Sequence, residues 1–150
     1  MKNFVNIILA SICVTLIFLA GKKEDQEKIV QNPTYVEKKI TYDAINDYKE
    51  ALSVAQTKNN KILVVFHAKW CVPCQKFNYE VLQSSRIKNK IKQKDFTEVY
   101  VDIDDEKNIE LRNKYNIKTI PFYVLIDKTE KIIRKDEGYK NSRDFYSWLD

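Results

Sequence analysis

Blocks of apolar residues along the chain predict four β-strands. Residues 62–66 (ILVVF) form a continuous apolar run of β-prone residues, which is typical of a central strand buried on both faces. Residues 96–104 (FTEVYVDID) predict a second strand, and the FYVLI segment opened by Pro121 predicts a third. A polar turn at 127–130 leads into a fourth strand at 131–135, and two strands joined this closely pair antiparallel.

Apolar residues at helical spacing predict helices around these strands. Residues 43–58 form the first helix, with Thr41 or Asp43 as the expected N-cap. Its apolar face consists of Ile45, Tyr48, Leu52 and Ala55. A long helical segment spans 72–91, and Ser84-Ser85 interrupts it at a point where a second helix can begin.

Two further helices complete the pattern. Residues 108–116 form one of them, and it ends at Asn116, a residue type that tolerates the left-handed conformation at a helix C-terminus. Gly138 marks a bend or a close approach of the backbone. Asn141 or Ser142 then caps the last helix. The apolar stripe of that helix consists of Phe145, Trp148 and Leu149.

The order of these elements predicts the fold class. The first two strands are joined by a helical crossover, so they are expected to be parallel and the crossover right-handed. The later hairpin adds antiparallel pairing. The sequence therefore predicts an α/β fold, in which helices cover both faces of a central mixed sheet of about four strands.

The N-terminal segment differs in composition from the rest of the chain. Residues 4–20 carry no charge, with Lys2 before them and two lysines after them, which predicts either a cleaved signal peptide or an uncleaved membrane anchor within 1–21. Cys13 lies inside this run, either as an apolar filler or as a lipid attachment site. Residues 22–40 are polar and predict a linker, so the domain itself is expected over 41–150.

The charge pattern limits the classes of partner. The chain has 26 Lys and Arg against 21 Asp and Glu, for a formal net charge of +5. These charges are interspersed and form no basic block, which indicates solubility rather than nucleic-acid binding.

A pair of cysteines, Cys71 and Cys74, lies where the first predicted strand gives way to a helix. Residues three apart in a helix are neighbours, so the pair can form and break a disulfide without moving the fold. The helix start favours a thiolate at Cys71, which we expect to be the more exposed sulfur and to attack a disulfide. Cys74 is then expected to resolve the mixed disulfide. Pro73 suits the first turn, because its missing N–H is not needed there.

A metal site or a purely structural disulfide fits the cysteine pair less well. A structural zinc site needs four ligands, and beyond the pair the chain offers only His67 and Cys13. A structural disulfide gains stability by closing a long loop, which a two-residue spacer does not do. We expect no metal and no bound cofactor. His67 is either a proton donor or acceptor near the thiols or a packed side chain. Trp70 is expected both to pack at the strand end and to lie over Cys71 as a partial lid.

The sequence resembles the thioredoxin superfamily. The resemblance covers about 41–150 and rests on ILVVFHAKWCVPCQKF (62–77), VYVDID (99–104) and LRNKYNIKTIPFYVLID (111–127). The segments around the cysteines are most similar to the C-terminal thioredoxin-like domain of DsbD-type disulfide reductases and to small membrane-tethered thioredoxin-like proteins of bacteria.

The resemblance implies a thioredoxin fold with a cis Ile120–Pro121 peptide bond beside the cysteines. It also implies that Thr119 and Ile120 contact the backbone of a substrate chain. Two acidic positions of the family are neutral here, at Val65 and Asn78. Proton transfer to Cys74 would then use water, a backbone group or Glu80, and we expect slower exchange than in a dedicated thioredoxin.

These inferences predict an extracytoplasmic thiol–disulfide oxidoreductase on the bacterial periplasmic or cell-envelope face, either membrane-anchored or secreted. It would exchange the Cys71–Cys74 pair with protein disulfide substrates, as a reductase that receives electrons from a partner redox protein. The alternative is a non-catalytic adaptor that binds peptides at the Pro121 groove.

Overall fold

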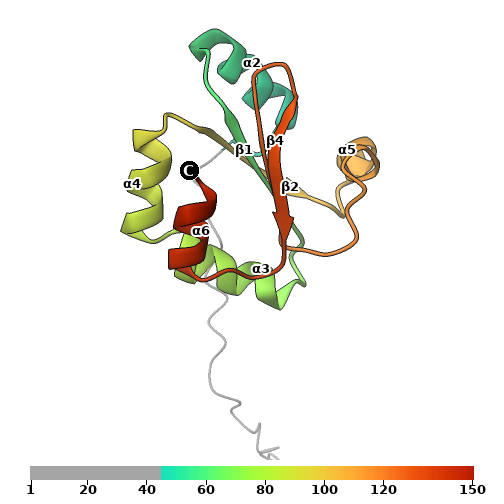
Figure 1. Ribbon diagram of the computed structural model, residues 1–150. Helices are drawn as coiled ribbons and strands as arrows, with labels where there is room; N and C mark the ends of the chain where they lie inside the picture. Colours follow the sequence, from blue (N-terminus) through green and yellow to red (C-terminus); the bar gives the residue numbers. More distant parts are fainter. Residues whose placement is uncertain (1–44) are drawn as a thin grey trace, which may run out of the picture. The chain divides into compact units, whose positions relative to one another are not determined.

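The computed structural model describes residues 45–150, and these form a four-stranded mixed sheet with helices on both faces (Figure 1). The predicted fold class is therefore confirmed. The elements, in chain order, are α2 (Tyr48–Lys58), β1 (Ile62–His67), α3 (Val72–Phe77), the π-helix η1 (Asn78–Leu82), α4 (Ser85–Gln93), β2 (Thr97–Asp102), the 3₁₀-helix η2 (Glu106–Asn108), α5 (Ile109–Lys114), β3 (Phe122–Ile126), β4 (Ile132–Glu137) and α6 (Ser142–Trp148).

The sheet has the strand order β2-β1-β3-β4. Strand β1 pairs parallel with β2, where Val64 faces Val99, and antiparallel with β3, where Val64 faces Val124. Strand β4 pairs antiparallel with β3 at the edge. The continuous apolar run in β1 is thus explained, because this strand lies between two others and is covered on both faces.

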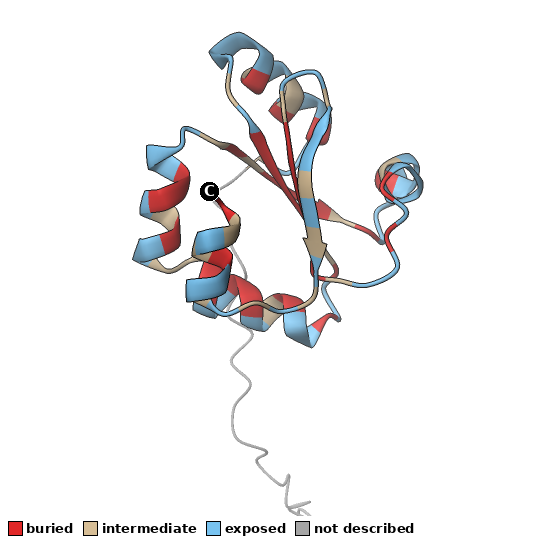
Figure 2. Ribbon diagram, viewed as in Figure 1, coloured by how far each residue is buried: buried red, intermediate tan, exposed pale blue. Residues whose placement is uncertain are grey.

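Two hydrophobic layers hold the helices to the sheet. One layer joins α2 to the sheet through Ala51 and Ala55, which are fully buried. The other joins α3, η1, α4 and α6 through side chains such as Phe77 and Phe145. Figure 2 shows that the buried residues lie on the strands and on the inward sides of the helices.

The first described helix begins later than predicted. It starts at Tyr48, with Asp47 as the N-cap, and the Asp47 carboxylate accepts a hydrogen bond from the backbone N–H of Glu50 at 3.0 Å. Ile45 is outside the helix, because its carbonyl accepts the backbone N–H of Tyr100 at 3.1 Å and extends the sheet edge. The predicted start of this helix at Asp43 and its caps lie outside the described residues.

The long helical segment after the cysteines is divided, as expected. Ser84 caps α4 and its hydroxyl accepts the N–H of Ile87 at 3.4 Å. Between α3 and α4 the chain forms the π-helix η1, which the sequence pattern did not predict. Asn78, at its start, is buried.

Local signals in the second half of the domain agree with the structure. Asn116 has a φ of 51°, which confirms the left-handed residue after α5. Gly138 has a φ of 79° and no atom near the position of a Cβ, so it marks a bend and not a close approach. Asn141 caps α6 by accepting the backbone N–H groups of Arg143 and Asp144.

The predicted leader (1–21), the linker (22–40) and Cys13 lie outside the described residues. Within residues 45–150, no helix combines the length and the apolar character needed to cross a bilayer.

Candidate redox site

The cysteine pair occupies the junction between β1 and α3. Strand β1 ends at His67, and α3 begins at Val72 with Cys71 as its N-cap. Cys71 and Cys74 form a disulfide, with their Cα atoms 5.2 Å apart. The backbone N–H of Cys74 points at the sulfur of Cys71, with an N···S distance of 3.1 Å. A negative charge on Cys71 would therefore meet a donor and the positive end of the helix.

Pro73 lies in the first turn of α3, as predicted. Its fixed φ suits this position and leaves no missing hydrogen bond. Val72 beside it is 70% exposed, so the loop around the disulfide presents apolar surface to solvent.

The expectation that Cys71 is the more exposed cysteine is wrong for this disulfide form. Cys71 is 3% exposed and Cys74 is 4% exposed. The reason lies in the loop before β3, because the carbonyl oxygen of Ile120 lies 3.8 Å from the Cys71 sulfur. This loop comes 49 residues later in the sequence, so the cysteine motif alone could not show it.

The same loop contains Pro121. The Ile120–Pro121 peptide bond is cis. The carbonyl oxygen of Pro121 accepts the backbone N–H of Gly138 at 2.7 Å, which ties the loop to the end of β4. Thr119 is exposed and Ile120 half-buried, so the structure brings Ile120 to the disulfide and leaves Thr119 open to solvent beside it.

Trp70 is 66% exposed, and a carboxylate from another loop holds its indole ring. Its indole N–H donates to Asp104 Oδ2 at 2.6 Å. Asp104 belongs to an acidic stretch, 102–106, that spans the end of β2 and the start of η2. Asp105 does cap η2, but Asp104 has the further task of orienting the residue next to Cys71. The 34 residues between the partners leave no local signal for it.

His67 ends β1 and faces Asp102 across the parallel pair β1–β2. Burial lowers the pKa of its imidazole, and the nearby Asp102 carboxylate opposes this shift. The ring also packs edge-on against Tyr100, with the centroids 6.4 Å apart. His67 is thus a partly buried, packed side chain near the site.

Val65 and Asn78 occupy the two positions that are acidic in the thioredoxin superfamily, and both are buried. Val65 is buried in β1 between Tyr100 and Tyr123. Asn78 is 2% exposed, and its Oδ1 accepts Gln83 Nε2 at 3.3 Å.

Glu80 is engaged elsewhere on the surface. Its Oε2 accepts the hydroxyl of Tyr139 at 2.6 Å and lies 4.0 Å from Lys76 Nζ. Its side chain is half exposed, so its contacts do not support a role as the proton route to the buried Cys74.

Tyr123 is a polar residue near this region that the sequence did not single out: its hydroxyl is buried and has no hydrogen-bond partner within residues 45–150.

Comparison with known proteins places this geometry in a family. Residues 43–128 match the family model described as thioredoxin-like. Thioredoxin Y1, a chloroplastic protein of Arabidopsis thaliana, is 33% identical over 95 residues, which cover 62% of this chain and 47% of that protein. Thioredoxin C-3 of Corynebacterium nephridii is 29% identical over 89 residues, which cover 59% of this chain and 56% of that protein. The chain spans about half the length of the curated relatives it matches.

Solved structures show the same architecture. A thioredoxin from Thermus thermophilus superposes with a TM-score of 0.64 at 25% identity, over 71% of this chain and 83% of that one. The C-terminal domain of Neisseria meningitidis DsbD in its oxidised form superposes with a TM-score of 0.59 at 16% identity, over 70% of this chain and 95% of that one, which supports the fold alone. The chain belongs to the thioredoxin-like family.

Proposed function

We propose that the chain is a thiol–disulfide oxidoreductase that exchanges the Cys71–Cys74 pair with disulfides of protein substrates, and that it works as a reductase. The observation that carries the proposal is the position of the Cys71 sulfur, which caps α3 and faces the N–H of Cys74 at 3.1 Å. That donor stabilises a thiolate, and the thiolate is the nucleophile in disulfide exchange.

The reaction transfers two electrons in two exchange steps. The Cys71 thiolate attacks one sulfur of the substrate disulfide, forms a mixed disulfide and releases the other substrate sulfur as a thiolate, which takes up a proton. Cys74 then loses its proton and its thiolate attacks the Cys71 sulfur. The intramolecular disulfide closes, the second substrate thiolate leaves, and the dithiol has been oxidised while the substrate has been reduced.

The loop at Thr119, Ile120 and Pro121 is the proposed substrate contact. The carbonyl oxygen of Ile120 in this loop lies 3.8 Å from the Cys71 sulfur, and Thr119 next to it is exposed. An extended substrate segment can pair with such a backbone as a short added strand. Trp70 and Val72 supply exposed apolar surface next to the same sulfur.

We expect proton transfer to Cys74 to be the slow step of the exchange. Val65 and Asn78 are neutral, and Glu80 binds Tyr139 at the surface. We expect exchange with dithiothreitol or insulin to be slower than for a dedicated thioredoxin, and stopped-flow rates equal to a thioredoxin's would contradict this.

We propose the direction of a reductase because the segments around the cysteines resemble those of DsbD-type disulfide reductases. The signal peptide or membrane anchor predicted at 1–21 is the basis for proposing an extracytoplasmic site with a partner redox protein as electron donor. Reduction potentials of such cysteine pairs span about −270 to −120 mV. Equilibration of the pair with glutathione measures this potential, and a value near about −120 mV would overturn the reductase assignment.

A trapping experiment tests the exchange itself. In Cys74→Ser the mixed disulfide on Cys71 has no resolving thiol, so adducts with substrate proteins should accumulate on non-reducing gels and disappear on reduction. The matched control is Cys71→Ser, which keeps the thiols of Cys74 and Cys13 but lacks the nucleophile, and should give few adducts. If Cys74→Ser binds the same proteins without covalent adducts, the chain is an adaptor and the proposal fails.

A further inference from the structure

A cavity lies between the start of α2, the η2–α5 segment and the turn that joins β3 to β4. Its volume is about 400 Å³, and neither cysteine lines it. Its apolar wall is formed by Tyr48, Leu52 and Leu111. Small-molecule sites have volumes of about 300–1,000 Å³ and are mostly apolar with a few polar groups, so this cavity has the size and character of one.

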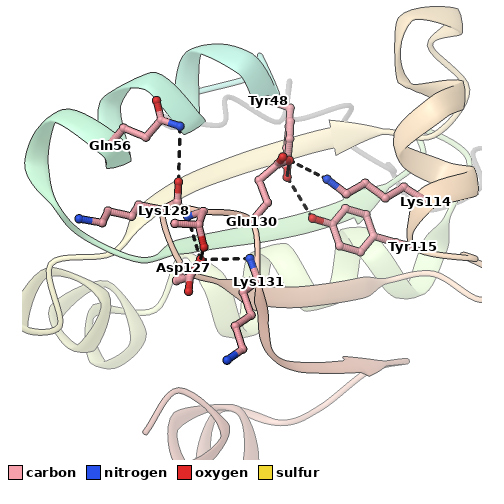
Figure 3. Close-up of polar contacts among 9 residues, drawn as sticks. Tyr48, Gln56, Lys114, Tyr115, Asp127, Lys128, Glu130 and Lys131 are labelled. Carbon is pink, nitrogen blue, oxygen red and sulfur yellow. Dashed lines mark hydrogen bonds and ion pairs between the residues drawn. The ribbon is translucent and has the colours of Figure 1, made fainter.

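A partly buried hydrogen-bond network fixes one side of the cavity (Figure 3). Glu130 Oε1 accepts the hydroxyl of Tyr48 at 2.6 Å and Nζ of Lys114 at 2.7 Å. The hydroxyl of Tyr48 also lies 3.0 Å from that of Tyr115. Glu130 has a φ of 65°, a conformation that non-glycine residues rarely adopt, and its bonds to α2 and α5 keep it there. The cavity is therefore formed before any ligand arrives.

The opposite side is equally fixed. Asn108, which is 5% exposed, donates its Nδ2 to the carbonyl oxygen of Asp102 at 2.9 Å. This bond ties η2 to the end of β2, so the wall contributed by η2 does not depend on a ligand for its position.

Three carboxylates and three ammonium groups line the cavity, so its formal charge is zero, and its preference for a ligand depends on which of these groups are already paired. Its three ammonium groups belong to Lys49, Lys107 and Lys114. Two of the three carboxylates that line it are already bound: Asp47 caps α2 through the N–H of Glu50, and Glu130 binds Tyr48 and Lys114. Hydrogen bonds from Lys114 and Tyr48 hold the pKa of Glu130 below its ordinary value, so it is ionised and satisfied.

The ammonium groups, in contrast, keep free donors. Each has three N–H groups. Lys107 shares one contact with Asp105 at 3.4 Å, and Lys114 one with Glu130. Lys49 forms no ion pair within 4.0 Å of any residue between 45 and 150, although it and Lys107 attract the Asp47 carboxylate at longer range. The third carboxylate, Glu110, lies in the first turn of α5, where the helix itself favours a negative charge.

We propose that this cavity is a second binding site, which takes a small amphipathic anion: an apolar body that packs on Tyr48, Leu52 and Leu111, with a carboxylate that Lys49 binds. The site is separate from the cysteine pair, so the proposal does not rest on the redox function.

The test compares two probes that differ only in charge. The full-length oxidised chain, labelled with ¹⁵N, is titrated with 3-phenylpropionate and, in parallel, with 3-phenylpropanamide at constant pH and ionic strength. The carboxylate should shift the amide signals of Lys49, Asn108, Leu111 and Glu130, and the neutral amide should bind more weakly. Lys49→Glu should weaken binding of the carboxylate by about fivefold, because an exposed attraction is lost and a repulsion added.

The matched control is Lys92→Glu, an exposed charge reversal on α4 that should leave binding unchanged. An unchanged spectrum away from residue 49 shows that Lys49→Glu is folded. The proposal is overturned if the carboxylate causes no shifts up to its solubility limit, if both probes bind equally, if the shifts centre on Ile120, or if Lys49→Glu binds as tightly as the native chain.

Discussion

Replacement of Tyr48 by Phe should destabilise the domain, whereas replacement of Tyr123 by Phe should stabilise it. Both rings are buried, at 7% and 0% exposure. The hydroxyl of Tyr48 donates to Glu130 at 2.6 Å and lies 3.0 Å from that of Tyr115. The hydroxyl of Tyr123 has no partner among residues 45–150. The Tyr→Phe substitution removes the same atom at both sites, so the difference in stability reports the hydrogen bonds alone.

The contacts give the expected magnitudes. A hydrogen bond to a charged group contributes about 1.5–3 kcal/mol, and Glu130 is partly exposed, so water replaces some of the loss. Tyr48→Phe should therefore lower the free energy of unfolding by about 2 kcal/mol. A buried polar group without a hydrogen-bond partner costs about 1–3 kcal/mol, and Tyr123→Phe removes that cost. The substitution also removes the packing contacts of one oxygen atom, which offsets part of the gain. Tyr123→Phe should raise the free energy of unfolding by about 1 kcal/mol.

Urea unfolding of the oxidised full-length chain, followed by far-UV circular dichroism, measures both effects. With a slope of about 1–3 kcal/mol per molar urea, Tyr48→Phe should move the midpoint down by about 1 M and Tyr123→Phe should move it slightly up. The slopes of the three proteins should agree. A Tyr123→Phe protein that is less stable than the native chain by more than about 1 kcal/mol would refute the reasoning, because it would mean that the hydroxyl is hydrogen-bonded.

Three further predictions concern single residues. Asp104→Ala removes the acceptor of the Trp70 indole N–H, so acrylamide should quench Trp70 fluorescence faster, while the urea midpoint moves little because both side chains are exposed. Lys114 and Tyr48 lower the pKa of Glu130, so the contribution of this carboxylate to stability is present above its unfolded pKa of about 4.5 and is lost as pH falls through the lower folded pKa. The difference in the free energy of unfolding between the native chain and Glu130→Gln should therefore shrink on acidification. A difference that stays constant from about pH 7 to about pH 3 would contradict the shift. Asn116→Val forces a β-branched residue to a φ of 51° and should destabilise the domain by about 1–2 kcal/mol, whereas Asn116→Gly should be tolerated, as thermal unfolding of the two variants would show.

Features that depend on local backbone chemistry could be predicted from the sequence. The continuous run at 62–66 gave the central strand, and Asn116 and Asn141 gave a helix end and a helix start. The position of Cys71 at the start of α3 also followed from its neighbours, because a cysteine pair three residues apart after an apolar run marks a strand-to-helix junction.

Features that depend on partners far along the chain could not be predicted. Burial of Cys71 depends on Ile120, and the orientation of Trp70 depends on Asp104. The start of α2 was also misplaced, because the apolar periodicity continued through Ile45, whose carbonyl is used by β2. In each case tertiary hydrogen bonds decided the outcome, and periodicity carries no information about them.

The most direct test of the proposed function is the pH dependence of alkylation at Cys71 in the reduced full-length chain. Iodoacetamide is added across a pH series, and mass spectrometry measures the rate at Cys71 separately from Cys74 and Cys13. Because the Cys71 sulfur faces the Cys74 N–H at the start of α3, the rate should follow a pKa well below the value of about 8.5 for free cysteine. A pKa at or above about 8.5, or a Cys71 that does not react in the folded reduced protein, would contradict the proposal.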